Sequence, residues 1–163
     1  MRKQGLRLAL GVFFTTMLTG LAADNPAVAQ DGQGKYITEA TVRLIKLVDS
    51  ANRDGYALQT NSFSIGGGWL KQSQDTWVPL YTVPLIGGKE YRFLGAGDAD
   101  TRDLDLQVLD PSGKVVAADE GTAPEAIVNY RPSDSGVYTV KLRLYASDKN
   151  QDCMSLGVVM IRK

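Results

Sequence analysis

Hydrophobic and polar residues alternate in short runs over most of this chain, and turn-forming residues separate the runs. In the clearest run, 103–108, apolar Leu104, Leu106 and Val108 alternate with polar residues. A period of two is that of a β-strand with one buried face. Comparable runs lie at 56–59, 62–65, 69–72, 77–85, 89–94, 115–116, 126–130, 137–145 and 153–161. Turn signals about every ten residues predict an antiparallel β-sandwich.

Glycine and proline positions refine this prediction. Pro79 and Pro84 exclude the run 77–85 from the centre of a sheet, because proline cannot donate to a ladder of hydrogen bonds. Gly87–Gly88 predicts a hairpin turn. Gly66–Gly68 interrupts the strand pattern and is interpreted as a hinge.

Four residues are predicted to have structural roles. In 110–113, Pro111 takes the second and Gly113 the fourth position of a β-turn. The run 134–138 resembles the tyrosine corner of immunoglobulin-type domains, in which a tyrosine hydroxyl bonds the backbone a few residues upstream. This resemblance implies that Tyr138, two residues after Gly136, fixes the entry of its strand.

The first 55 residues precede the strands and divide into three parts. Residues 1–29 are predicted to be a signal peptide, because a basic start and an apolar stretch precede the small residues Ala27–Ala29. An N-terminal membrane anchor is the alternative. Residues 30–35 are polar and glycine-rich, which predicts a flexible linker. Residues 36–55 are predicted to form an amphipathic helix that ends at Gly55, and residues 56–163 form the sandwich.

The predicted helix has one apolar face, which consists of Ile37, Ala40, Thr41, Leu44, Leu47, Val48 and Ala51. We expect this face to cover an open face or end of the sandwich. Docking of a partner helix is the alternative role.

Charge and cysteine content limit the possible partners. Removal of residues 1–29 takes three basic residues and one acidic residue from the 18 of each in the chain, which leaves a net charge of −2. Nucleic-acid binding is not predicted, because it needs a concentrated basic face. The single cysteine, Cys153, cannot form an internal disulfide. It is interpreted as a buried apolar side chain, with a reactive thiol as the alternative.

Four segments resemble, in order, the bacterial pre-peptidase C-terminal domain: GKEYRF (88–93), DLDLQV (103–108), DPSGKVVA (110–117) and GVYTV (136–140). The resemblance covers residues 69–163 and implies an all-β, antiparallel, jelly-roll-like β-sandwich, here preceded by one amphipathic α-helix instead of a catalytic domain. Members of that family are accessory modules on secreted proteases and other hydrolases, and some bind calcium or insoluble substrates.

Acidic residues crowd the middle of the chain, where Glu120 accompanies Asp98, Asp100, Asp103, Asp105 and Asp119. Loop carboxylates are typical ligands of Ca²⁺, so the five aspartates are a candidate calcium site. They do not form an EF-hand loop, because Asp103 stands where that loop needs glycine. The alternative is that these residues cap turns, keep strand edges soluble and pair with Arg102.

No enzymatic motif is present. The chain has no histidine, which excludes Ser-His-Asp and Cys-His nucleophile systems and histidine zinc sites. Asp103 with Asp119 or Glu120 is a candidate carboxylate pair for glycoside hydrolysis. Trp69, Trp77, Tyr81 and Tyr91 are a candidate stacking face for sugars or peptides, although strand aromatics are more often core residues.

These observations predict an exported, non-catalytic binding or accessory module that acts in the periplasm or outside the cell. The predicted ligand is another exported protein or a polysaccharide, with calcium as a candidate cofactor. The alternatives are a small carboxylate-dependent glycoside hydrolase and a structural subunit of an exported complex. No membrane contact is expected after signal cleavage.

Overall fold

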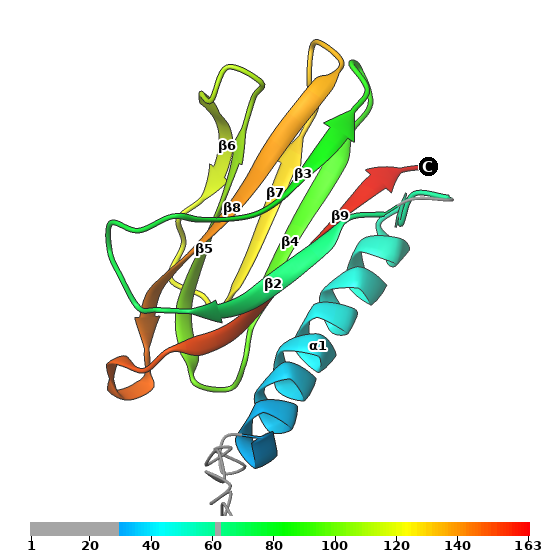
Figure 1. Cartoon of the computed structure of the whole chain (residues 1–163). Coiled ribbons are helices and arrows are strands. Elements are labelled where there is room, and N and C mark those ends of the chain that lie inside the picture. Colours follow the sequence, from blue (N-terminus) through cyan, green and yellow to red (C-terminus); the bar gives the residue numbers. More distant parts are fainter. Residues whose placement is uncertain (1–29, 61–62) are drawn as a thin grey trace, which may run out of the picture.

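Two antiparallel sheets and one helix make up the described part of the chain, residues 30–60 and 63–163 of a computed structural model (Figure 1). The predicted signal peptide, 1–29, lies outside these residues. Sheet A has the strand order β1-β9-β4-β7, with β2 also paired to β9, and sheet B has the order β3-β8-β5-β6. The strands of sheet A are β1 (Tyr56–Ala57), β2 (Ile65–Leu70), β4 (Tyr91–Gly97), β7 (Glu125–Tyr130) and β9 (Cys153–Arg162). Those of sheet B are β3 (Val78–Leu85), β5 (Thr101–Leu109), β6 (Val115–Asp119) and β8 (Gly136–Ser147).

The fold is an all-β sandwich with one helix, as the alternation of the sequence predicted. Strands β2 to β9 form the orders 2-9-4-7 and 3-8-5-6, which is the arrangement of a jelly roll. The two prolines of β3 predicted that this strand is not in the centre of a sheet, and β3 is an edge strand of sheet B.

Alternate residues of the strands form the core between the sheets. Leu104, Leu106 and Val108 are at most 1 % exposed, which confirms the clearest alternating run. They pack with Phe93 and Val159 of sheet A and with further residues of both sheets. The polar residues that alternate with them, Asp103, Asp105 and Gln107, therefore face away from the core on the outer side of sheet B.

Helix α1 (Gln30–Arg53) covers the outer face of sheet A (Figure 1). Leu44 and Ala51 are buried against Leu94 and Met160 of the sheet, so most of the predicted apolar face is correct. Ile37 is the exception, since its side chain is 45 % exposed. The predicted helix stop is confirmed at Gly55, which has φ = +89°.

The linker predicted at 30–35 is instead the first part of α1, which begins at Gln30. Two side-chain contacts lie within this extension, at Gly34 and Lys35. The Thr38 hydroxyl donates to the Gly34 carbonyl oxygen at 2.7 Å, and Lys35 pairs with Glu39 one helical turn away.

The run Gly66–Gly68 is not a hinge, because it lies within β2. Gly67 is opposite Leu156 of β9, and a Cβ at Gly67 would be 2.2 Å from the carbonyl oxygen of Ser155. Close approach of the backbones, rather than flexibility, explains glycine at this position.

Gly87–Gly88 does not form a hairpin either, because β3 and β4 belong to different sheets. The segment carries the chain from sheet B to sheet A, and Gly88 has φ = +77°. A glycine pair indicates a tight turn, but it does not indicate whether the strands on either side of the turn pair with each other.

The four residues predicted to be structural meet at one end of the sandwich. The Gly113 N–H donates to the Asp110 carbonyl oxygen at 2.9 Å, which closes the β-turn between β5 and β6. A Cβ at Gly136 would be 2.8 Å from Pro111 Cγ. The hydroxyl of Tyr138 donates to the Asp134 carbonyl oxygen at 3.1 Å, as in a tyrosine corner.

Within the described ranges, no helix has both the length and the apolar character needed to cross a membrane.

Candidate functional site

The five aspartates of the predicted calcium site are divided between two regions. Asp98 and Asp100 lie in the turn between β4 and β5, at the end of sheet A. The Asp98 carboxylate is fully buried and accepts hydrogen bonds from the N–H groups of Asp100 (3.0 Å) and Met154 (2.6 Å). Its oxygens therefore hold this turn against β9.

The Asp119 carboxylate also accepts hydrogen bonds from backbone N–H groups. Its Oδ1 accepts from the Gly121 N–H at 3.0 Å, and its Oδ2 accepts from the Ile127 N–H of β7 at 2.8 Å. The side chain thus joins the last strand of sheet B to the edge of sheet A. Within residues 30–60 and 63–163, no group of three or more acidic or cysteine side chains is placed to hold a metal ion.

Asp103 and Asp105 share a pocket of about 270 Å³ on the outer face of sheet B. We call it the acidic pocket, and its lining consists of Asp103, Asp105, Glu120, Gly121, Thr122, Arg143 and Tyr145. Alternation along β5 brings the two aspartates to this face, the loop after β6 supplies Glu120, and β8 supplies Arg143. Of the predicted carboxylate pairs, Asp103 and Glu120 therefore share a site, and Asp119 is outside its lining.

Arg143 is the organising side chain of the acidic pocket. Its Nε donates to Asp105 Oδ2 at 2.7 Å, one terminal nitrogen donates to the Gln74 carbonyl oxygen at 2.7 Å, and the other is 3.5 Å from Glu120 Oε2. The guanidinium carbon lies 4.5 Å from the ring centre of Trp77 and 5.1 Å from that of Tyr145. Hydrogen bonds and cation–π contacts thus hold the guanidinium against two aromatic rings.

Asp103 differs from its neighbours because its Oδ1 is buried and has no hydrogen-bond partner among the described residues. The residue is 8 % exposed. Burial, followed by repulsion from Asp105, raises the pKa of the Asp103 carboxyl, and Arg143 opposes that rise. Burial also raises the pKa of Asp105 despite its bond to Arg143. A buried polar atom without a partner is costly, so the Asp103 carboxyl, which lines the acidic pocket, is a candidate for contact with a ligand.

The four aromatics considered as a stacking face do not lie together. Tyr91 is in the core, the hydroxyl of Tyr81 is buried, and Trp69 packs edge-on against Tyr36 of α1. Only Trp77 borders the acidic pocket, through Arg143. Sequence reasoning missed Arg143 and Tyr145, although their alternation with Leu142 and Leu144 places both on the outer face of β8.

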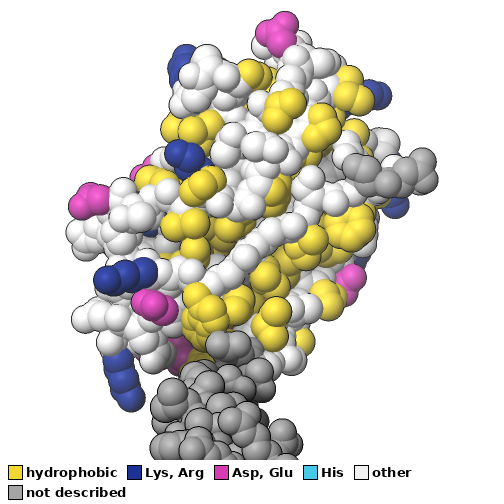
Figure 2. Space-filling view, viewed as in Figure 1, with side chains coloured by type: hydrophobic (Ala, Val, Ile, Leu, Met, Phe, Trp, Pro, Cys, Tyr) yellow, Lys and Arg dark blue, Asp and Glu magenta, His cyan; other side chains and the backbone are white. Residues whose placement is uncertain are grey.

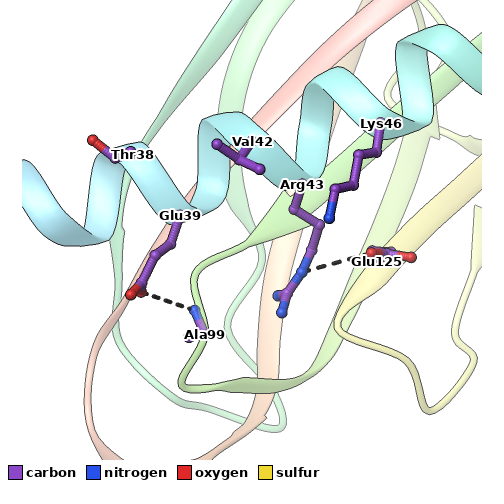
Figure 3. Close-up of a pocket in the computed structure, with 7 residues that line it drawn as sticks. All are labelled: Thr38, Glu39, Val42, Arg43, Lys46, Ala99 and Glu125. Atoms are coloured by element: carbon purple, nitrogen blue, oxygen red, sulfur yellow. Dashed lines mark hydrogen bonds and ion pairs between the residues drawn. The ribbon is translucent and has the colours of Figure 1, made fainter.

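A second hollow, of about 320 Å³, lies between α1 and sheet A (Figure 3). There the Arg43 guanidinium donates to the carbonyl oxygens of Gly97 (2.7 Å) and Asp98 (2.6 Å) and lies 3.6 Å from Glu125. Glu39 accepts from the Ala99 N–H at 3.3 Å. These polar groups attach the helix to the β4–β5 turn, so they are already engaged within the protein.

An apolar groove of about 190 Å³ runs between α1 and β2. Figure 2 shows hydrophobic side chains gathered along these two elements. Ile45, Phe63 and Ile65 line the groove and are each more than half exposed. The groove presents almost no polar group that could orient a ligand.

Cys153 is fully buried, and burial raises the pKa of its thiol to about 12. The thiolate that a reactive cysteine needs therefore does not form near neutral pH.

Comparisons with known proteins add little to this geometry. No protein-family model matches the chain, and no curated protein is similar to it. Among solved structures, it is similar to the CBM22-1 and GH10 modules of endo-1,4-β-D-xylanase 10B from Clostridium thermocellum, complexed with xylohexaose. The identity is 16 %, the TM-score is 0.33, and the match covers 68 % of this chain and 26 % of the xylanase chain. The match thus spans about a quarter of the length of that xylanase chain.

Proposed function

We propose that this chain is a non-catalytic binding module that recognises a polysaccharide through the acidic pocket on sheet B. The observation that carries the proposal is the carboxyl of Asp103, whose buried Oδ1 has no hydrogen-bond partner among the described residues, in a pocket whose arginine is held against two aromatic rings. Sugar hydroxyls are donors that a carboxylate accepts well, and the C–H faces of a sugar ring pack on aromatic side chains.

The rigidity of the site supports a binding role. Asp103, Asp105, Arg143 and Tyr145 belong to two paired strands, so the backbone holds them in place before any ligand arrives. The export predicted from residues 1–29 would bring such a module to extracellular or periplasmic polysaccharides.

Binding to a panel of soluble polysaccharides, measured by affinity gel electrophoresis, tests the proposal. Tyr145→Ala removes a ring that is 36 % exposed at the pocket, and we expect it to weaken binding about tenfold. Tyr36→Ala is the matched control, because Tyr36 lies on α1, which covers the other sheet. Equal retardation of both variants, or no retardation of the wild-type chain by any polysaccharide, would contradict the proposal.

A second candidate is carboxylate-dependent glycoside hydrolysis in the same pocket. The raised pKa of Asp103 favours it, because a general acid must hold its proton near the working pH. Glu120 would be the second carboxylate. Release of reducing ends that is lost in both Asp103→Asn and Glu120→Gln would favour hydrolysis over binding alone.

A further inference from the structure

The charges in the acidic pocket do not balance. Among the described residues, the lining holds three carboxylates, those of Asp103, Asp105 and Glu120, and one guanidinium, that of Arg143. Arg143 contacts Asp105 at 2.7 Å and Glu120 at 3.5 Å, and neither contact reaches Asp103. The carboxylate left over is that of Asp103, which is 8 % exposed and whose Oδ1 has no hydrogen-bond partner among the described residues, so a positive charge beside it would be stabilised.

We infer that the acidic pocket selects a sugar unit that carries a free, protonated amine, and that the ammonium group pairs with Asp103. The inference rests on the proposed function and adds the class of sugar to it. An ammonium group compensates the unpaired carboxylate, whereas a neutral hydroxyl or an acetylated amine leaves the charge uncompensated.

The other groups of the pocket favour an amino sugar over a lysine side chain. A lysine ammonium brings all its donors on one atom at the end of a flexible stem. An amino sugar carries hydroxyls next to its amine, and these can donate to Glu120 and accept from the Thr122 hydroxyl at the same time. The volume of about 270 Å³ is near the lower end for small-molecule pockets and suits a single ring.

Calorimetric titration of the full chain with three hexamers tests the inference: glucosamine, N-acetylglucosamine and cellohexaose, near neutral pH. We expect the glucosamine hexamer to bind about tenfold more tightly than either neutral hexamer, a difference of about 1.4 kcal/mol. Added salt should reduce that preference, since it arises from a charge pair. Asp103→Asn should remove it. Asp49→Asn, which deletes the same charge from an exposed position on α1, should retain it.

The other possible results of the titration contradict either this inference alone or the proposed function as well. Equal affinity for the amino and neutral hexamers would overturn the inference and leave the proposed function standing. Absence of binding to all three would contradict both. A short lysine peptide that binds as tightly as the glucosamine hexamer would overturn the inference in favour of a protein ligand.

Discussion

Asp103 is a residue that the fold could do without. Its Oδ1 is buried and has no hydrogen-bond partner within residues 30–60 and 63–163, and its carboxyl is repelled by that of Asp105. Such an arrangement lowers the stability of the folded state, because the charged form loses hydration and gains no partner. Groups of this kind concentrate at binding and catalytic sites, where a ligand supplies the missing partner.

Asp103→Asn should therefore stabilise the free protein at neutral pH, by about 1 kcal/mol in the free energy of unfolding. Because the pKa of Asp103 is raised in the folded state, its charged form opposes folding. Below its unfolded pKa, Asp103 is protonated in both states and does not oppose folding. As the pH rises through its folded pKa, the carboxyl becomes charged in the folded protein and this stability is lost. The gain of the variant should thus be near zero in strong acid and should grow as the pH rises.

Thermal unfolding of the wild type, Asp103→Asn and Asp49→Asn over the acid-to-neutral range measures this effect. Asp49→Asn should follow the wild type at every pH, since Asp49 is exposed on α1. A lower melting temperature for Asp103→Asn at neutral pH would show that the carboxylate has a stabilising partner.

The sequence predicted the acidic residues of the site but not their partner. Alternation alone placed Asp103 and Asp105 on the outer side of β5. Arg143 lies 38 residues after Asp105, and the register that brings them together depends on how β5 pairs with β8. The contact of Trp77 with the Arg143 guanidinium likewise depends on tertiary packing.

At the scale of elements, α1 is attached through both apolar and polar contacts. Leu44 is 4 % exposed between the helix and sheet A, and Arg43 caps two carbonyl oxygens of the β4–β5 turn. The apolar face could be predicted from its period of 3.6 residues. The start at Gln30 could not, because a glycine-rich segment has weak helix propensity and its neighbours decide its conformation.

Leu44→Ala should lower the free energy of unfolding by about 2–5 kcal/mol, because it opens a cavity under the helix. Ile45→Ala is the control, since Ile45 is 53 % exposed and its loss should change stability by less than about 0.5 kcal/mol. Urea unfolding followed by circular dichroism measures both. Equal effects of the two substitutions would mean that α1 is not packed on sheet A through Leu44.

At the scale of the whole molecule, the outer faces of the two sheets differ in what lies on them. Sheet A is covered by α1, whereas sheet B carries the acidic pocket on its outer side. The sandwich itself was predictable from the alternation of β5 and β8 and from the prolines of β3. The sheet to which each strand belongs was not, because turn residues such as Gly87–Gly88 look the same in a hairpin and in a crossing between sheets.

The central claim is that ligand binds on the outer face of sheet B. Backbone amide chemical shifts, recorded by NMR during titration with the tightest-binding of the three hexamers, test it most directly. We predict that the largest changes occur at 103–105, 119–122 and 143–145, with α1 unchanged. Changes confined to 38–46 of α1 and to 97–99, beside the second hollow, would contradict the account.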